Sequence, residues 1–231
     1  MSPRSQDINQ SGLFGFLAQP DAPTKAGVVI LPTIFGVNAF VRGYAETLAR
    51  AGIAAAVWDH YDGLPLTTDY EESKRRARKI SDAGMHATVK KWTDYMHEEL
   101  RLTSVGMLGF CLGGRYALMV AAQDQRIKAC AAGYPSIDMP RLPNQEQDAL
   151  ALAAGIACPV HILQPGHDHV ASPETYAALK ETLSKRAAPT TWQYHPDAEH
   201  GFLHRNAPAA NLVASAIASP QLIGFLQGCL L

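Results

Sequence analysis

The 231-residue sequence predicts an α/β protein with a mostly parallel central sheet and helices on both faces. Short apolar runs alternate along the chain with longer segments of helical periodicity. The apolar runs are nearly continuous, which is typical of parallel strands that are buried on both faces. No internal repeat or low-complexity linker interrupts the pattern, so we expect a single domain over residues 1–231.

The first half of the chain is predicted to form strand 26–33, helix 38–52, strand 53–59 and a mostly helical region 70–100. In the first helix, Phe40, Tyr44 and Leu48 recur at helical spacing, and Gly52 ends the pattern. The longer helical region is expected to break into two pieces near Gly84.

The second half is predicted to form strand 104–110, helix 112–123, strands 127–135 and 158–166, helix 172–186, strand 190–195 and a last helix, whole or broken, over 208–228. The helix at 172 has Ser172 as its N-cap and Pro173 at its first position, where proline is favoured.

Composition excludes several classes of protein. The net charge of −1 and the isoelectric point near 6.7 give no sign of a nucleic-acid-binding protein. The polar N-terminus lacks the apolar core of a signal peptide, and no apolar run is expected to reach the roughly 18 residues of a membrane helix. The four cysteines include no close CxxC pair, which favours free thiols in a reducing compartment. We expect a soluble cytoplasmic protein.

Three reactive side chains follow three different strands. Cys111, Asp168 and His200 come after the strands predicted at 104–110, 158–166 and 190–195. Ligands of open parallel sheets bind beyond the carboxyl ends of the strands. The chain order nucleophile, acid, base is the order of the α/β-hydrolase fold. The sequence therefore predicts a Cys–Asp–His triad.

The stretch GFCLGG at 109–114 has the pattern of a nucleophile elbow, with cysteine in the place of serine. Gly109 and Gly113 allow the strand and the helix to approach closely. The thiol lies at a helix N-terminus, which favours the thiolate. We expect the backbone N–H groups of Leu112 and Ile34 to form the oxyanion hole. A lone intracellular cysteine is more often an unreactive buried thiol, and that interpretation stands for Cys130 and Cys158.

These motifs resemble the dienelactone hydrolase (carboxymethylenebutenolidase-like) family over nearly the whole chain. The resemblance is carried by IFGVNAFVR (34–42), GFCLGG (109–114), GYP (133–135), GHDHV (166–170) and EHGF (199–202). It implies an α/β-hydrolase domain, usually monomeric, that opens an enol-lactone through a thiol ester acyl-enzyme and needs no cofactor or metal. It also implies the same triad and the same two oxyanion donors.

Two positions depart from the family pattern. Thr33 stands where the family's dienelactone enzymes have a glutamate that takes part in thiol activation. Either thiolate formation here relies on His200 and the helix end, or the chemistry differs. His204, followed by Arg205, stands where those enzymes have a carboxylate-binding arginine. A second arginine is expected in the basic run 74–79, most of which is otherwise interpreted as a solvated helix face.

No insertion is long enough for a lid domain, which favours a small substrate. The expected pocket wall favours an ester or lactone that is mostly apolar with one polar or acidic group. The residues expected around it are Thr33, Phe35, Tyr134, Phe202, His204 and Arg205.

Three alternatives remain at this point. His167, His169, His200 and His204 could hold zinc, although 200–204 is expected to be a loop. The acyl-enzyme could transfer its acyl group to an acceptor other than water, or cleave thioesters. The protein could also be non-catalytic, since a fold does not imply a function.

Overall fold

The computed structural model describes residues 3–231. Eight strands form one sheet in the order β1-β2-β4-β3-β5-β6-β7-β8. The strands are β1 (Arg4–Gln10), β2 (Leu13–Gln19), β3 (Ala26–Leu31), β4 (Ala54–Trp58), β5 (Ser104–Phe110), β6 (Ile127–Gly133), β7 (Val160–His167) and β8 (Thr190–Glu199). The helices are α1 (Ala39–Arg50), α2 (Tyr70–Ala77), α3 (Asp82–Glu98), α4 (Leu112–Gln123), α5 (Ala149–Ala153), α6 (Pro173–Ser184) and α7 (Leu212–Leu230).

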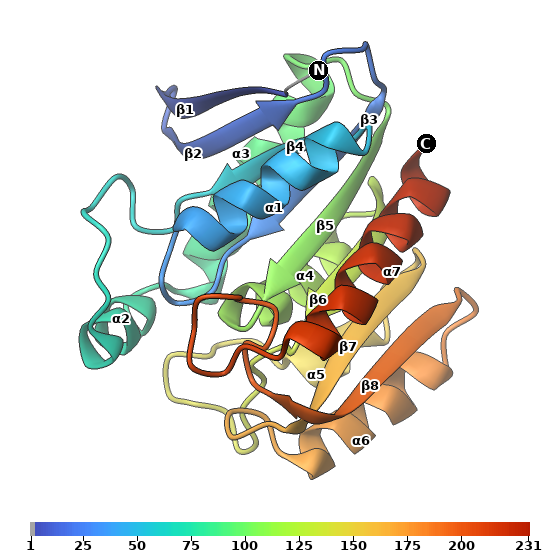
Figure 1. Cartoon of the computed structure of the whole chain (residues 1–231). Helices are drawn as coiled ribbons and strands as arrows, with labels where there is room; N and C mark the ends of the chain where they lie inside the picture. The colour runs from blue at the N-terminus through green and yellow to red at the C-terminus, as the bar shows by residue number, and fades with distance from the viewer. Residues whose placement is uncertain (1–2) are drawn as a thin grey trace.

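The sheet is parallel from β4 across to β8, and the hairpin of β1 and β2 extends it with antiparallel pairing. Figure 1 shows this hairpin at the edge beside β4. Strands β3 and β4 are buried at every position, as expected for strands covered on both faces. The predicted α/β class with a mostly parallel sheet is confirmed.

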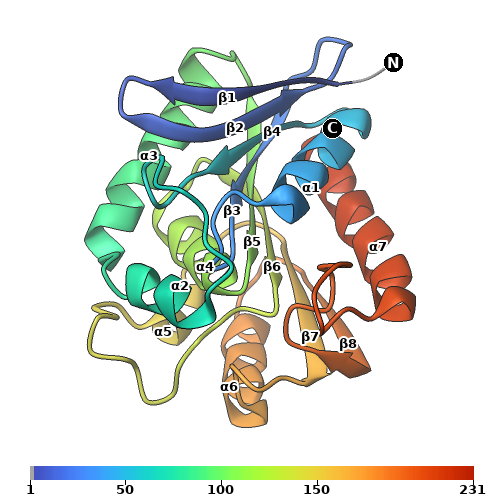
Figure 2. The ribbon, with the colours of Figure 1, turned by 60° about the vertical axis from the view of Figure 1, so that its left-hand side comes forward.

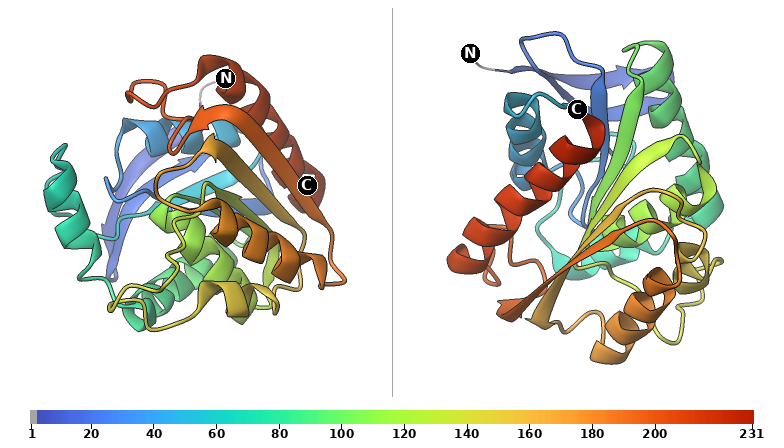
Figure 3. Two further views of the ribbon diagram at one scale, coloured as in Figure 1. Left: turned by 90° about the horizontal axis from the view of Figure 1, so that it is seen from below. Right: turned by 90° about the vertical axis from the view of Figure 1, so that its right-hand side faces the viewer.

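Helices cover both faces of the sheet. α1 and α7 bury their apolar side chains on one face, and α3, α4, α5 and α6 bury theirs on the other. Figures 2 and 3 show the two helical layers with the sheet between them. In Figure 1, α2 stands apart from the sheet beyond the carboxyl ends of its central strands.

Most predicted elements lie where the periodicity indicates, with three differences. The β1–β2 hairpin and α5 are absent from the sequence prediction. The break in the 70–100 region falls at residues 78–81, not at Gly84, because the Ser81 side chain caps α3 by accepting from the Gly84 N–H. The last helix, expected whole or broken, is the single helix α7, which runs through Pro220.

α7 corrects the expectation about membrane helices. Its 19 residues make it long and apolar enough to cross a membrane by length and composition. The sequence pattern hides it because small residues and Pro220 interrupt its large apolar side chains. Leu222 and Leu226 on its inner side are buried against the sheet, whereas Val213 and Ile217 are exposed, and only 28% of its most apolar 18-residue stretch is buried.

Candidate active site

Cys111 occupies a strained turn between β5 and α4. Its φ of 56° and ψ of −118° place a non-glycine residue in a sparsely populated region of backbone conformation. A Cβ atom at Gly109 would overlap the Gly113 carbonyl, and one at Gly113 would overlap the Leu31 carbonyl. Both glycines are therefore required for β5, α4 and the end of β3 to meet at this turn.

Backbone hydrogen bonds fix the turn from the neighbouring strand. The Cys111 N–H donates to the Gly133 carbonyl at 3.0 Å, and the Cys111 carbonyl accepts from the Ser136 N–H at 3.0 Å. Between these partners, Tyr134 also has a positive φ, of 39°. The strain at the cysteine is thus held by the segment that follows β6.

Asp168 and His200 lie side by side beyond the ends of β7 and β8. The His200 Nδ1 is 2.9 Å from Asp168 Oδ1 and 3.0 Å from Oδ2. Both side chains are buried, with exposed fractions of 8% for His200 and 3% for Asp168. The imidazole therefore presents Nδ1 to the carboxylate, which leaves Nε2 as the nitrogen available for a nucleophile.

The charges of the site favour a protonated imidazole. Burial alone would lower the pKa of His200, but the nearby Cys111 and Asp168 side chains raise it to about 10. Burial would raise the pKa of Asp168, yet the hydrogen bonds it accepts from His200, Ala171 and Tyr176 hold this pKa below its ordinary value. Among residues 3–231, Nε2 has no hydrogen-bond partner of good geometry. Such bonds often tighten only when substrate is bound.

The loop after β3 forms a turn that exposes one N–H group. The Gly36 N–H donates to the Thr33 carbonyl at 3.1 Å, and the Phe35 N–H donates to the Thr33 hydroxyl at 3.3 Å. The Ile34 carbonyl accepts from the Tyr61 hydroxyl at 2.6 Å. The Ile34 N–H takes part in none of these bonds, so it can point at a ligand.

The N–H of Leu112 lies in the first turn of α4, where a helix has no internal acceptor for it. Leu112 and Ile34 both line the same cavity of about 670 Å³ as Cys111 and His200. The two backbone donors expected from the sequence and the two reactive side chains thus face one space.

Four of the six residues expected around the substrate line this cavity, namely Thr33, Phe35, Tyr134 and His204. The other two, Phe202 and Arg205, are not among its lining residues. Phe202 is fully buried, and its ring packs against Tyr134 and His195 behind the cavity wall. The nearby Arg205 is exposed.

Two positively charged residues of the basic run, Lys74 and Arg78, line the cavity. The sequence does not distinguish them from the other residues of this run. Lys74 forms an ion pair with Glu71 at 2.9 Å, while Arg78 is exposed and has no ion pair within residues 3–231. Of the run 74–79, only Lys74, Ala77 and Arg78 line the cavity. Helical spacing of 74 and 78 is the signal that could separate them from their neighbours.

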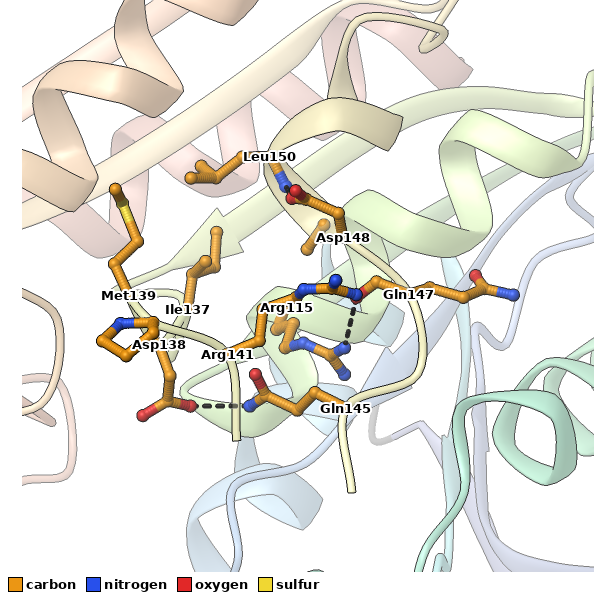
Figure 4. A pocket seen from close by; sticks show the side chains of 11 residues that line it. Arg115, Ile137, Asp138, Met139, Arg141, Gln145, Gln147, Asp148 and Leu150 are labelled. Atoms are coloured by element: carbon orange, nitrogen blue, oxygen red, sulfur yellow. Dashed lines mark hydrogen bonds between the residues drawn. The ribbon is translucent and has the colours of Figure 1, made fainter. Parts of the chain in front are cut away.

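A second cavity, of about 560 Å³, lies behind the loop that follows β6 and is shown in Figure 4. Its one deeply buried cation, Arg115, is paired with Asp82 and also donates to the Gln147 carbonyl. At its edge, the Gln145 side chain donates to Asp138 at 2.6 Å. Cys111, Asp168 and His200 are not among its lining residues.

The zinc alternative gains no support from the arrangement of side chains. Within the described range 3–231, no three His, Cys, Asp or Glu side chains gather as metal ligands. The ring of His169 lies 5.8 Å from that of His200, but Nδ1 of His200 is already engaged by Asp168.

The sheet and the site define an α/β-hydrolase. The chain belongs to the dienelactone hydrolase family, whose sequence pattern matches residues 13–230. This membership and the resulting class, a hydrolase of ester or lactone bonds, confirm the resemblance inferred from the motifs.

Relatives and solved structures are similar in sequence and fold. The carboxymethylenebutenolidase of Pseudomonas putida is 26% identical over 223 residues, which is 92% of this chain and 90% of that enzyme. A Bradyrhizobium protein named as a probable 2-oxo-3-(5-oxofuran-2-ylidene)propanoate lactonase is 27% identical over 162 residues, 67% of this chain and 65% of its own length. The dienelactone hydrolase structure from Anabaena variabilis superposes with a TM-score of 0.75 at 20% identity, covering 100% of both chains.

Proposed function

We propose that the protein hydrolyses small esters or lactones with Cys111 as nucleophile, His200 as acid and base, and Asp168 as the partner of the imidazole. One observation carries the proposal: the His200–Asp168 pair and the Cys111 elbow open into one cavity, together with two free backbone donors. The grouping matches the roles of a nucleophile triad, which is recognised by its geometry.

In the proposed reaction, the Cys111 sulfur attacks the acyl carbon, and the N–H groups of Ile34 and Leu112 stabilise the oxyanion. The carbon–oxygen bond of the ester or lactone then breaks, and the leaving oxygen takes the proton from His200. Water attacks the resulting thiol ester while His200 removes its proton. The carbon–sulfur bond breaks, the carboxylic acid is released, and the thiolate–imidazolium pair forms again.

Thr33 gives this proposal its distinctive feature. Its hydroxyl accepts from the Phe35 N–H, so it shapes the turn, and a hydroxyl at this position cannot act as a carboxylate base. His200, with its raised pKa, is therefore proposed to hold the proton of the thiol without help from this side of the cavity.

We infer that the preferred substrates carry an anionic group. Lys74 and Arg78 place two positive charges on the α2 side of the cavity, and Arg78 has no ion pair among the described residues. A guanidinium binds a carboxylate through two parallel hydrogen bonds. The rest of the wall includes the aromatic side chains of Phe35, Phe40 and Tyr134, and it also carries two carboxylates, Asp138 and Glu199.

The decisive experiment measures hydrolysis of matched small esters and lactones, with and without a carboxylate, by wild type and Cys111→Ala. Loss of turnover in Cys111→Ala, with Cys229→Ala unchanged, supports the thiol nucleophile. Equal activity in wild type and Cys111→Ala would overturn it. Transfer of the acyl group to an added alcohol or thiol in preference to water would instead identify an acyltransferase.

The anion preference is tested separately with Arg78→Ala. This variant is expected to lose about tenfold or more in kcat/KM for the anionic substrate and little for its neutral counterpart. Arg75→Ala is the matched control, because Arg75 lies on the same helical segment but outside the cavity and is paired with Glu72. Equal losses for both substrates would contradict the assignment.

We further infer that residues 1–231 act as a single-domain monomer in the cytoplasm. All eight strands belong to one sheet, and the four cysteines are free. Sedimentation and cell fractionation test these two inferences.

A further inference from the structure

Asp168 accepts more hydrogen bonds than its contact with His200 requires. Its Oδ1 accepts from the Val170 N–H at 2.8 Å and from the Ala171 N–H at 3.0 Å. Its Oδ2 accepts from the Tyr176 hydroxyl at 2.7 Å. Among residues 3–231, Tyr176 is the one side chain besides the imidazole that donates to this carboxylate, and it donates to Oδ2 alone.

The position of Tyr176 is set by its surroundings. It lies near the start of α6, which begins at Pro173 after the Ser172 cap, and only 2% of its surface is exposed. Its ring meets that of Trp192 edge-on at 6.4 Å. Trp192 is itself held by a hydrogen bond from Nε1 to the Gln164 side chain at 2.8 Å. The hydroxyl therefore has little freedom to leave the carboxylate.

A buried carboxylate with this set of donors has two properties that a triad needs. It stays ionised, because each donor favours the charged form. It is also a weaker base, because the Tyr176 hydroxyl shares the charge of Oδ2, so the proton between the two residues stays on Nδ1 of His200. The imidazole then keeps one tautomer and one orientation toward Cys111.

We propose that Tyr176 is a positioning residue of the catalytic triad, acting through the hydrogen bond from its hydroxyl to Oδ2 of Asp168. The proposal rests on the proposed function of Cys111, Asp168 and His200. It assigns Tyr176 no contact with the substrate, so its effect must pass through Asp168.

A double-mutant cycle tests this path. Tyr176→Phe keeps the ring and removes the hydroxyl, and is expected to lower kcat by about tenfold with little change in KM, the usual scale for a hydrogen bond to a charged group. In an Asp168→Asn background, the same substitution is expected to change kcat less than about twofold, because the charged acceptor is gone. Tyr44→Phe is the control, since it removes a buried hydroxyl that is bonded to Ser219 and not to the triad.

The pH profile gives a second readout. Without the Tyr176 donor, the pKa of Asp168 rises, so the acidic loss of kcat/KM begins at a higher pH in Tyr176→Phe than in wild type. A general loss of packing would not move this limb. All variants are compared at a temperature at which thermal unfolding shows each of them to be folded.

Equal losses from Tyr176→Phe in the wild-type and Asp168→Asn backgrounds, or an unmoved acidic limb, would overturn the proposal. These results are distinct from failure of the proposed function, which Cys111→Ala reports. If wild type is active and Cys111→Ala is not, but the cycle is additive, only the role of Tyr176 is excluded.

Discussion

Arg115 and Asp82 form a buried ion pair with two parallel hydrogen bonds, Nη1 to Oδ1 at 2.7 Å and Nη2 to Oδ2 at 2.8 Å. Their side chains are 2% and 1% exposed. Asp82 also accepts from the Gln147 N–H at 2.9 Å. The pair joins the first turn of α3 to the first turn of α4, so it braces the helix that carries Cys111 at its N-terminus.

Breaking this pair is expected to cost more than breaking an exposed one. Asp82→Ala leaves the Arg115 charge buried without a counter-charge, and we expect the free energy of unfolding to fall by about 3–5 kcal/mol. Asp94→Ala on the same helix is the control, because its pairs with Lys90 and Arg126 are partly exposed, and about 1 kcal/mol is expected there. Urea unfolding measures both variants, and equal losses would contradict the difference in burial.

The raised pKa of His200 predicts a positive charge beside Cys111 at neutral pH. With a folded pKa of about 10, the imidazole stays protonated from neutral pH up to that value and stabilises a neighbouring thiolate. Alkylation of Cys111 by iodoacetamide at neutral pH should therefore be faster in wild type than in His200→Ala, which lacks this charge. Cys111→Ala supplies the background from the other thiols, and equal rates in the two proteins would contradict the role of the imidazolium.

The buried His60 is expected to lower the free energy of unfolding at acidic pH. Burial lowers its pKa from 6.5 to about 3, and its Nε2 has no hydrogen-bond partner within residues 3–231. Between these two pH values the unfolded chain binds a proton that the folded chain does not. The contribution of neutral His60 to the free energy of unfolding is therefore fully present above pH 6.5. It falls as the pH drops from 6.5 toward about 3, by up to about 1.4 kcal/mol per pH unit.

This contribution is isolated by comparing wild type with His60→Phe in urea at several pH values. The difference between their unfolding free energies should change below pH 6.5 and stay constant above it. A difference that does not vary with pH would show that His60 takes up a proton in the folded protein as readily as in the unfolded chain.

Loss of the Tyr61 hydroxyl is expected to slow catalysis, although Tyr61 lies apart from the proposed triad. Its hydroxyl holds the Ile34 carbonyl at 2.6 Å and lies 3.2 Å from the Ser73 carbonyl of α2. Tyr61→Phe frees the turn that presents the Ile34 N–H, so kcat should fall by about tenfold, less than when an oxyanion donor itself is removed. Tyr116→Phe is the control, since that ring contacts Trp58 but its hydroxyl is not bonded to the turn. If both variants kept wild-type kcat, the bond from Tyr61 would have no part in shaping the oxyanion hole.

The best-predicted parts of the fold are those in which local chemistry and tertiary packing agree. The predicted bounds of β5 and α4 coincide with the structure because an apolar run, a glycine turn and a helical pattern meet at Cys111. β1 is not predicted because only Ile8 of its seven residues is buried. Its pairing with β2 therefore produces no alternation of apolar and polar side chains in the sequence.

The sequence predicts the site residues that directly follow strands. It predicts less well those that are contributed by helices. The sequence order places Cys111, Asp168 and His200 at strand ends, and the structure brings Asp168 and His200 into contact. Tyr176 could not be found in this way, because it reaches Asp168 from the helix that follows. Lys74 of α2 and Arg78, which directly follows this helix, reach the cavity only because the flanking loops place α2 there, and the sequence does not reveal that placement.

The strand order has a consequence for how activity can return after denaturation. The proposed oxyanion loop follows β3, the proposed nucleophile follows β5, and the proposed acid and base follow β7 and β8, so the site draws on strands from the middle of the sheet to its edge. Recovery of catalysis should therefore lag behind or coincide with the last of these strand pairings, and never precede it. Enzyme activity therefore reports when this part of the sheet is complete. Spectroscopic signals from single helices do not report this step.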